Sequence, residues 1–209
     1  MLIDKLTVSE KRADRFALLF DNGTEIKVSA GQIAEFGLYS GRELTNDEYA
    51  ALREGMDRSI SKTRAMRILG TRNLSAREVE RRLIVKGEST ETARETVEWL
   101  EKTGLIDDEE YAAGIVSYYS GKGYGAARIR NELFTRGIPR GMWENAFNKL
   151  KKPEEAVTHY LDKKLKGSAD KDDIRKAVNS LCSRGFSYEE AKDLVRKYVE
   201  NKEEIEDRD

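Results

Sequence analysis

The sequence predicts a mainly α-helical fold of tandem three-helix repeats in an elongated, curved array, with a small N-terminal three-stranded antiparallel β-sheet. Three observations lead to this prediction. Charged residues make up 37% of the 209 residues, against about 25% in an average protein, whereas hydrophobic residues make up only 38%. Apolar residues recur at helical spacing from residue 45 onward. A segment that ends in a basic residue and glycine occurs three times.

The first 44 residues are expected to form the sheet. Residues 2–8, 15–20 and 24–28 alternate apolar and polar side chains as strands do, and Asn22-Gly23 supplies the positive φ angles of a tight hairpin turn. Three strands alone bury too little apolar surface to be stable, so the sheet should pack on the following helix. Residues 30–41 are expected to form a short helix and a loop.

Capping residues and glycines mark the helices that follow. A Ser or Thr with Glu three residues later forms a capping box, and this pattern occurs at Thr45–Glu48, Ser75–Glu78 and Ser187–Glu190. Helix-ending glycines are expected at Gly70, Gly87, Gly104, Gly137 and Gly185. The expected helices are a lead-in helix after Thr45, then residues 58–70, 75–86, 90–103, 108–120, 125–136, 140–150, 153–166, 171–184 and 188–201.

The repeated segment sets the expected organisation. Residues 82–87, 132–137 and 180–185 each contain Leu, two variable residues, a basic residue and Gly. Their spacing indicates units of three helices, each with a thin core of its own. The predicted parts are an N-terminal meander with a short helix, a lead-in helix with the first repeat, the second repeat, and the third repeat with an acidic C-terminal tail, at residues 1–44, 45–106, 107–152 and 153–209. Tyr118 lies on an apolar stripe with Tyr111 and Ile115, which predicts core packing, but like Tyr119 and Tyr124 it could instead stack on bases or rings.

The net charge of −1 conceals an uneven distribution. Residues 58–86 contain nine positive and two negative side chains, and residues 122–152 contain eight and two. The last eight residues contain two positive and five negative side chains. Basic clusters of this kind are typical of surfaces that bind nucleic acid or another polyanion, although they also occur as solvated helix faces paired with nearby Glu.

No residue pattern indicates an enzyme. The carboxylates of Asp107-Asp108-Glu109-Glu110 stand at a helix start, where acidic residues cap backbone N–H groups. Gly121-Lys122-Gly123-Tyr124-Gly125 lacks the spacing of a nucleotide-binding P-loop, which leaves two interpretations: a turn between helices, or a helix N-terminus that holds a DNA phosphate. His159 and Cys182 are interpreted as packing or boundary residues, and we expect no cofactor and no metal.

Helical angles select candidate contact residues. On helix 75–86, Arg77 and Arg81 should point away from the apolar stripe, and on helix 125–136 Arg128 and Arg130 should flank it. Side chains on or beside these helices extend the candidate surface. The full set is Arg77, Arg81, Lys122, Tyr124, Arg128, Arg130 and Arg136, with Arg64, Arg67 and Arg72 as further possibilities.

Several protein classes are excluded by what the sequence lacks. No run of 18 apolar residues predicts a transmembrane helix, and the first residues do not have the pattern of a secretory signal. One cysteine and one histidine predict neither an internal disulfide nor a zinc site of the usual kind. We therefore expect a soluble cytoplasmic protein that makes no contact with membranes and is a monomer.

The sequence motifs and their order resemble those of the RecX family of recombinase regulators. The resemblance rests on Gly104-Leu105-Ile106-Asp107-Asp108-Glu109-Glu110-Tyr111-Ala112, on residues 122–133 and on Arg136-Gly137-Ile138, and residues 74–83 with Lys86-Gly87 resemble the family's first repeat. The resemblance covers residues 58–200, with a more divergent third repeat. It implies a chain of three-helix repeats with no catalytic residues, in which Asp107, Asp108 and Tyr111 are architectural.

The resemblance also implies a function. RecX proteins bind the RecA recombinase in the groove of its filament on DNA, inhibit its ATPase and strand-exchange activities, and limit the filament in DNA repair and the SOS response. Weak, non-specific contact with single- and double-stranded DNA is implied as well. Two alternatives stay open: a sequence-independent DNA-binding module of helical repeats, and a helical scaffold for another protein.

Overall fold

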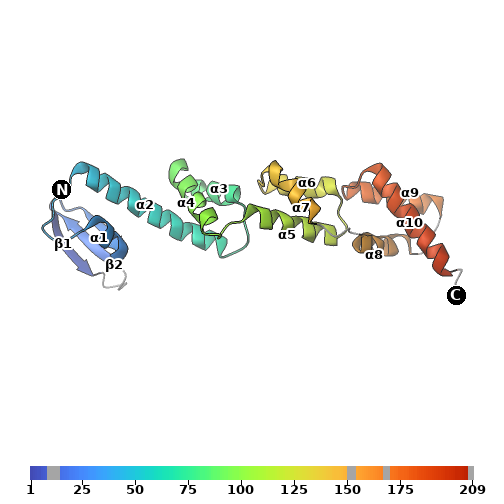
Figure 1. Cartoon of the computed structure of the whole chain (residues 1–209), viewed down its shortest axis with the longest axis horizontal. Coiled ribbons are helices and arrows are strands. Elements are labelled where there is room, and N and C mark those ends of the chain that lie inside the picture. Colours follow the sequence, from blue (N-terminus) through green and yellow to red (C-terminus); the bar gives the residue numbers. More distant parts are fainter. Residues whose placement is uncertain (9–14, 150–153, 167–169, 207–209) are drawn as a thin grey trace. The chain divides into compact units, whose positions relative to one another are not determined.

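The structure is a computed structural model that describes residues 1–8, 15–149, 154–166 and 170–206. The chain forms two compact units, one of residues 1–71 and 80–99 and the other of residues 72–79 and 100–209. Figure 1 shows the order of the elements, and it confirms the predicted fold class of a mainly α protein with a small N-terminal three-stranded antiparallel sheet. No helix of the described residues is both long enough and apolar enough to cross a membrane.

The sheet is the predicted meander. Strands β1 (Ile3–Val8), β2 (Arg15–Phe20) and β3 (Glu25–Ser29) pair antiparallel in the order β1-β2-β3. In the turn between β2 and β3, Gly23 has a φ of +81°, and the side chain of Asn22 accepts a hydrogen bond of 2.9 Å from the Thr24 N–H. The Asn-Gly pair therefore forms the tight turn that the sequence predicts.

The buried face of the sheet is completed by helices of the same unit. Leu18, Ile26 and Val28 form one apolar cluster with Leu52 of the long helix after residue 45, and Ile33 and Phe36 of the short helix that follows the sheet pack against it. The helices of this unit are α1 (Ala30–Phe36), α2 (Asn46–Leu69) and most of α4 (Thr90–Lys102). The expectation that the sheet packs on the following helix is confirmed.

Helix α2 differs from the prediction, because the lead-in helix and the helix at 58–70 are one continuous helix of 24 residues. It starts with the predicted capping box of Thr45 and Glu48. Gly55 lies inside the helix and does not interrupt it. The ring of Phe36 from α1 occupies the space beside this glycine, where a Cβ atom would lie 3.3 Å from the ring. Gly55 thus allows α1 and α2 to approach closely.

Helix α3 (Ala76–Val85) contributes to both units, and its inward residues Val79 and Leu83 are buried. The second unit then contains two groups of helices. In the first group α5 (Asp108–Gly121), α6 (Ala126–Thr135) and α7 (Trp143–Asn148) surround one apolar cluster. In the second group α8 (Glu154–Leu165), α9 (Lys171–Ser183) and α10 (Tyr188–Glu206) surround another.

Two helical predictions need correction. The helix expected at 140–150 is a 3-10 turn, η1 (Arg140–Met142), followed by the six-residue helix α7. Four of the five predicted helix-ending glycines have the expected positive φ, whereas Gly70 has a right-handed φ of −61°. Gly70 therefore ends α2 without the left-handed turn that glycine alone adopts readily.

Tyr118 is not a core residue. Its side chain is 56% exposed, and the inward face of α5 is formed by Ala112, Ile115 and Val116 instead. The buried stripe of α5 therefore lies nearer to Tyr119 than to Tyr118. A spacing of three residues from Ile115 to Tyr118 is compatible with one face of a helix, but a spacing of four, from Ile115 to Tyr119, describes the inward face of α5 better.

Candidate functional site

The ten predicted contact residues lie in different environments. Arg64, Arg72 and Arg136 each pair with a carboxylate: Arg64 binds Glu88, Arg72 lies 3.4 Å from Glu78, and Arg136 lies 3.3 Å from Glu132. Arg64 and Arg136 are also half-buried. Their positive charge is largely balanced within the protein, so they contribute less to a surface that attracts polyanions than the sequence suggested.

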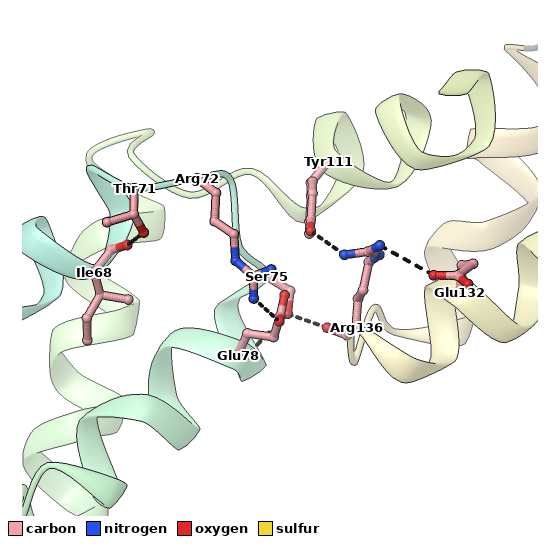
Figure 2. A network of polar contacts seen from close by, with 8 residues as sticks. All are labelled: Ile68, Thr71, Arg72, Ser75, Glu78, Tyr111, Glu132 and Arg136. Carbon is pink, nitrogen blue, oxygen red and sulfur yellow. Dashed lines mark hydrogen bonds and ion pairs between the residues drawn. The ribbon is translucent and has the colours of Figure 1, made fainter. Parts of the chain in front are cut away.

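Arg136 belongs to a network of polar contacts in the second unit (Figure 2). Its guanidinium donates to the Tyr111 hydroxyl at 3.3 Å as well as to Glu132, and its carbonyl accepts a hydrogen bond from the Ser75 hydroxyl. Ser75 in turn accepts from the Glu78 N–H at 3.1 Å. This is half of the predicted capping box, since the Glu78 carboxylate pairs with Arg72. The network ties the start of α3 to the end of α6.

The arginines of α3 are placed as predicted. Arg77 and Arg81 are exposed on the side of the helix away from the buried Val79 and Leu83. Neither forms an ion pair with a carboxylate of the described residues. The aliphatic stem of Arg77 packs against Gly137, where a Cβ atom would lie 2.7 Å from Cδ, so the stem is held while the guanidinium faces water.

The arginines of α6 are exposed too, but they have neighbours. Arg128 lies 3.0 Å from Glu132, which it shares with Arg136. The guanidinium of Arg130 lies 5.3 Å from the ring centre of Phe147, which is the distance of a cation–π contact. Of the two, Arg130 forms no ion pair with a carboxylate of the described residues, although its charge helps to lower the pKa of the Glu190 carboxyl, and Arg67 on α2 forms no such ion pair either.

Lys122 and Tyr118 form an exposed pair of cation and ring. The ammonium of Lys122 donates to the Tyr118 hydroxyl and lies 4.2 Å from the centre of its ring. This hydrogen bond raises the pKa of Lys122 above its ordinary value. An exposed aromatic ring with a cation beside it is suited to stacking on a base while the cation meets a phosphate. The sequence left Tyr118 with two interpretations, core packing or stacking on bases, and its exposure in the structure favours stacking.

Two of the four carboxylates at 107–110 make structural contacts. Asp107 is the N-cap of α5 and accepts from the Glu110 N–H at 2.9 Å, and Asp108, only 8% exposed, accepts from the Ala76 N–H at 2.9 Å. Burial of the Asp108 carboxyl raises its pKa. Among the described residues, no three His, Cys, Asp or Glu side chains are grouped as a metal site would require.

Comparisons with known proteins match the chain to one family. The family model described as "RecX, second three-helix domain" matches residues 107–146. "Regulatory protein RecX" of Vibrio vulnificus is 31% identical over 134 residues, which are 62% of this chain and 86% of the relative. The chain belongs to the RecX family. "Regulatory protein RecX" of Caldanaerobacter subterraneus is 24% identical over 192 residues, 90% of this chain and 95% of the relative. A crystal structure of regulatory protein RecX has the same fold, with a TM-score of 0.75 and 20% identity over 96% of this chain and 98% of that one.

In this RecX-family chain, sequence reasoning missed Arg184. Its guanidinium lies between two rings, 4.4 Å from the centre of Tyr124 and 4.1 Å from that of Tyr160. It also donates to the carbonyls of Lys122 at 2.8 Å and Gly123 at 3.1 Å. Tyr124, a predicted contact residue, is therefore half-buried in a structural stack. The signal was present, because Arg184 is the basic residue of the third repeated segment, as Arg136 is of the second.

The loop before α6 is not a free phosphate cradle. The N–H groups of Gly125 and Ala127 donate to the carbonyls of Arg184 at 2.9 Å and Gly185 at 3.0 Å. Backbone donors at the start of α6, which a phosphate would need, are thus bonded to the end of α9. Of the two interpretations of this RecX segment, the turn between helices is the one that the contacts support.

Proposed function

We propose that the chain regulates the RecA recombinase by binding its filament on DNA, where it inhibits ATP hydrolysis and strand exchange. Membership of a family whose members are named regulatory proteins carries this proposal. In this proposal the chain has no catalytic activity of its own and acts as a cytoplasmic monomer in DNA repair and the SOS response. Its contribution is binding energy, supplied by the exposed faces of α3 and α6.

The charges on these two helices support the proposal. Arg77, Arg81 and Arg130 are exposed and form no ion pair with a carboxylate of the described residues, although the charge of Arg130 also acts on Glu190, and Lys122 carries its charge beside the exposed ring of Tyr118. A filament of protein on DNA presents phosphates as well as protein surface, and cations without an ion pair can meet phosphates without first giving up a carboxylate partner. The acidic charge of residues 153–209 would meet basic protein surface.

The decisive experiment measures ATP hydrolysis by RecA on single-stranded DNA against concentration of the chain. We expect hydrolysis to fall at sub-stoichiometric amounts. Replacement of both α6 arginines, Arg128→Ala with Arg130→Ala, should shift the inhibition curve to higher concentration. The matched control is Arg175→Ala with Arg196→Ala, which removes two exposed arginines from α9 and α10. Hydrolysis that stays unchanged at a saturating excess of the unaltered chain would refute the proposal.

A second candidate function, sequence-independent binding of bare DNA, is favoured by the Tyr118–Lys122 pair. Neutralisation of four to six phosphates predicts a log–log slope of affinity against salt of about −4 to −5. Fluorescence anisotropy with duplex and single-stranded oligonucleotides at several salt concentrations measures it. Binding that is absent, or that does not change with salt, removes this candidate without touching the first. A pulldown in which RecA is not enriched would instead favour a scaffold for another protein.

A further inference from the structure

A pocket of about 470 Å³ lies in the first unit. Its walls come from α1, α2 and α4, and they include Gln32, Arg58, Lys62, Met66 and Trp99. This volume falls in the range of about 300–1,000 Å³ that is typical of small-ligand sites. None of these residues is among the ten candidate contact residues predicted from the sequence. All residues that line the pocket belong to the first unit.

The pocket has a positively charged wall. Arg58 and Lys62 lie one turn apart on α2 and therefore on the same face of the helix. No carboxylate of the described residues pairs with Lys62, and the Arg58 guanidinium is 3.8 Å from Glu54, at the outer limit of an ion pair. Glu35 is the one acidic residue among those that line the pocket. The described residues that line the pocket therefore carry one more positive than negative charge.

An aromatic and apolar wall faces the same space. Met66 is 45% exposed although it is apolar, and the ring of Trp99 is half-buried. The Lys62 ammonium lies 4.7 Å from the centre of the Trp99 ring. Cation and indole are therefore close enough for one ligand to meet both, with a charged group at the ammonium and a planar group against the apolar wall.

Gln32 adds a donor that has no acceptor. Its side chain is only 6% exposed, and its Oε1 accepts from the backbone N–H of Ser29 at 2.9 Å and from the Ser29 hydroxyl at 3.2 Å. These bonds fix the orientation of the amide. Its Nε2 is buried and has no hydrogen-bond partner within the part of the chain that the structure describes. A buried donor without an acceptor destabilises the protein, so a ligand atom that accepts from it would gain affinity.

We propose that this pocket binds one nucleotide unit. The phosphate meets Arg58 and Lys62, the base lies against Trp99 and Met66, and a carbonyl oxygen or ring nitrogen of the base accepts from Gln32 Nε2. The unit belongs either to a free nucleotide or to a single strand. Inorganic phosphate fits the cations but leaves the indole and the amide unused. An acidic peptide fits the cations too, but its carboxylate side chains have no planar ring for the indole wall.

The fluorescence of Trp99 tests the proposal without any recombinase. The chain has two tryptophans, so Trp143→Phe leaves Trp99 as the only one. We expect saturable quenching by thymidine 5′-monophosphate, by single-stranded oligothymidylate, or by both. The first probe alone indicates a free nucleotide, and the second alone indicates a strand. Inorganic phosphate should cause no quenching, and Trp99→Phe in the unaltered background should abolish the effect that both probes cause.

Three variants assign the binding to the pocket. Arg58→Ala with Lys62→Ala should raise the dissociation constant more than tenfold. Gln32→Glu keeps an oxygen for Ser29 but replaces the donor with a carboxylate, so it should also weaken binding severalfold. Arg53→Ala with Arg94→Ala is the matched control, because it removes two exposed arginines of the same unit that do not line the pocket. Far-ultraviolet circular dichroism checks that each variant is folded.

Three outcomes would overturn the proposal: no quenching by either probe at millimolar concentration, equal losses in the pocket and control variants, or equal quenching by hexaglutamate. The last result would indicate a site for acidic peptides. Because the assay contains no RecA, its failure leaves inhibition of the recombinase unaffected. Failure of that inhibition, conversely, leaves the quenching unaffected.

Discussion

Two helices of the second unit begin against the end of another helix, and they do so with different chemistry. At the start of α3, side chains make the joint: the Ser75 hydroxyl donates to the Arg136 carbonyl, and the Asp108 carboxylate accepts from the Ala76 N–H. At the start of α6, the backbone makes it: the Gly125 and Ala127 N–H groups donate to the carbonyls of Arg184 and Gly185. Both joints satisfy helix-terminal groups that would otherwise lack partners.

The difference follows from how closely the two backbone segments approach each other at each contact. A Cβ atom on Gly125 would lie 2.4 Å from the backbone of Gly185, so only glycine allows the direct backbone bonds. At the other joint the serine hydroxyl spans the gap instead. The repeated basic-Gly pair, Arg136-Gly137 and Arg184-Gly185, is the acceptor side of both joints. These two copies of the repeated segment therefore hold the starts of α3 and α6.

The largest expected effect is that of Gly125→Ala. The new methyl group meets backbone rather than a flexible side chain, so the joint must open, and overpacking of this kind costs about 1–3 kcal/mol. We expect the upper end, measured as the free energy of unfolding in urea. Gly114→Ala is the control, because Gly114 lies inside α5 with nothing within 4 Å of its Cβ position. That change should stabilise the protein by about 0.5–1 kcal/mol. A harmless Gly125→Ala would contradict the backbone joint.

Arg184→Ala should have the next largest effect. It removes two hydrogen bonds from a charged group and two cation–π contacts, so we expect a loss of about 2 kcal/mol. Thermal unfolding followed by circular dichroism measures it. Arg184→Lys keeps the charge but not the planar group that stacks between Tyr124 and Tyr160, so it should restore less than half of the loss. Full rescue by lysine would show that charge alone matters at this position.

Ser75→Ala tests the side-chain joint. The hydroxyl caps α3 and also donates to Arg136, and loss of such a cap costs about 1 kcal/mol. The effect should be smaller than that of Gly125→Ala, because no clash is introduced. Urea denaturation at neutral pH compares the two variants directly. If Ser75→Ala lowered the free energy of unfolding more than Gly125→Ala, the side-chain contacts at the start of α3 would contribute more to stability than the backbone contacts at the start of α6.

Asp108→Asn should make the side-chain joint independent of pH. Burial raises the pKa of Asp108, so over the range between its unfolded and folded values the folded state holds more protons. Stability of the unaltered chain therefore loses the Asp108 contribution as the pH rises through that range. Asparagine keeps an oxygen for the Ala76 N–H but does not titrate. We expect its stability relative to the unaltered chain to rise as the pH rises above the ordinary pKa of an aspartate, measured in a denaturant series at each pH. A constant difference would exclude Asp108 as the source.

Short-range patterns predicted much of the fold. The Asn22-Gly23 turn, the Thr45–Glu48 box and four glycine turns depend on neighbouring residues, and all are present. The close approach of the Phe36 ring to Gly55 inside α2 could not be predicted, because Phe36 belongs to another helix. In the candidate site, exposure of Arg77 and Arg81 followed from helical angle. The ion pairs of Arg64 and Arg72 could not be predicted from helical angle, because their carboxylate partners do not lie on the same helix as the arginine.

The smallest effect on stability is expected for Arg128→Ala with Arg130→Ala. Alanine keeps the Cβ of Arg128 that lies against Gly185, and Glu132 keeps Arg136 as a partner. What is lost is one exposed ion pair and one exposed cation–π contact, each worth about 0.5 kcal/mol. Thermal unfolding should thus barely change, while the concentration needed to inhibit RecA should rise. A large fall in stability would place both arginines in the joint with α9, and the loss of inhibition would then report folding rather than contact with the filament.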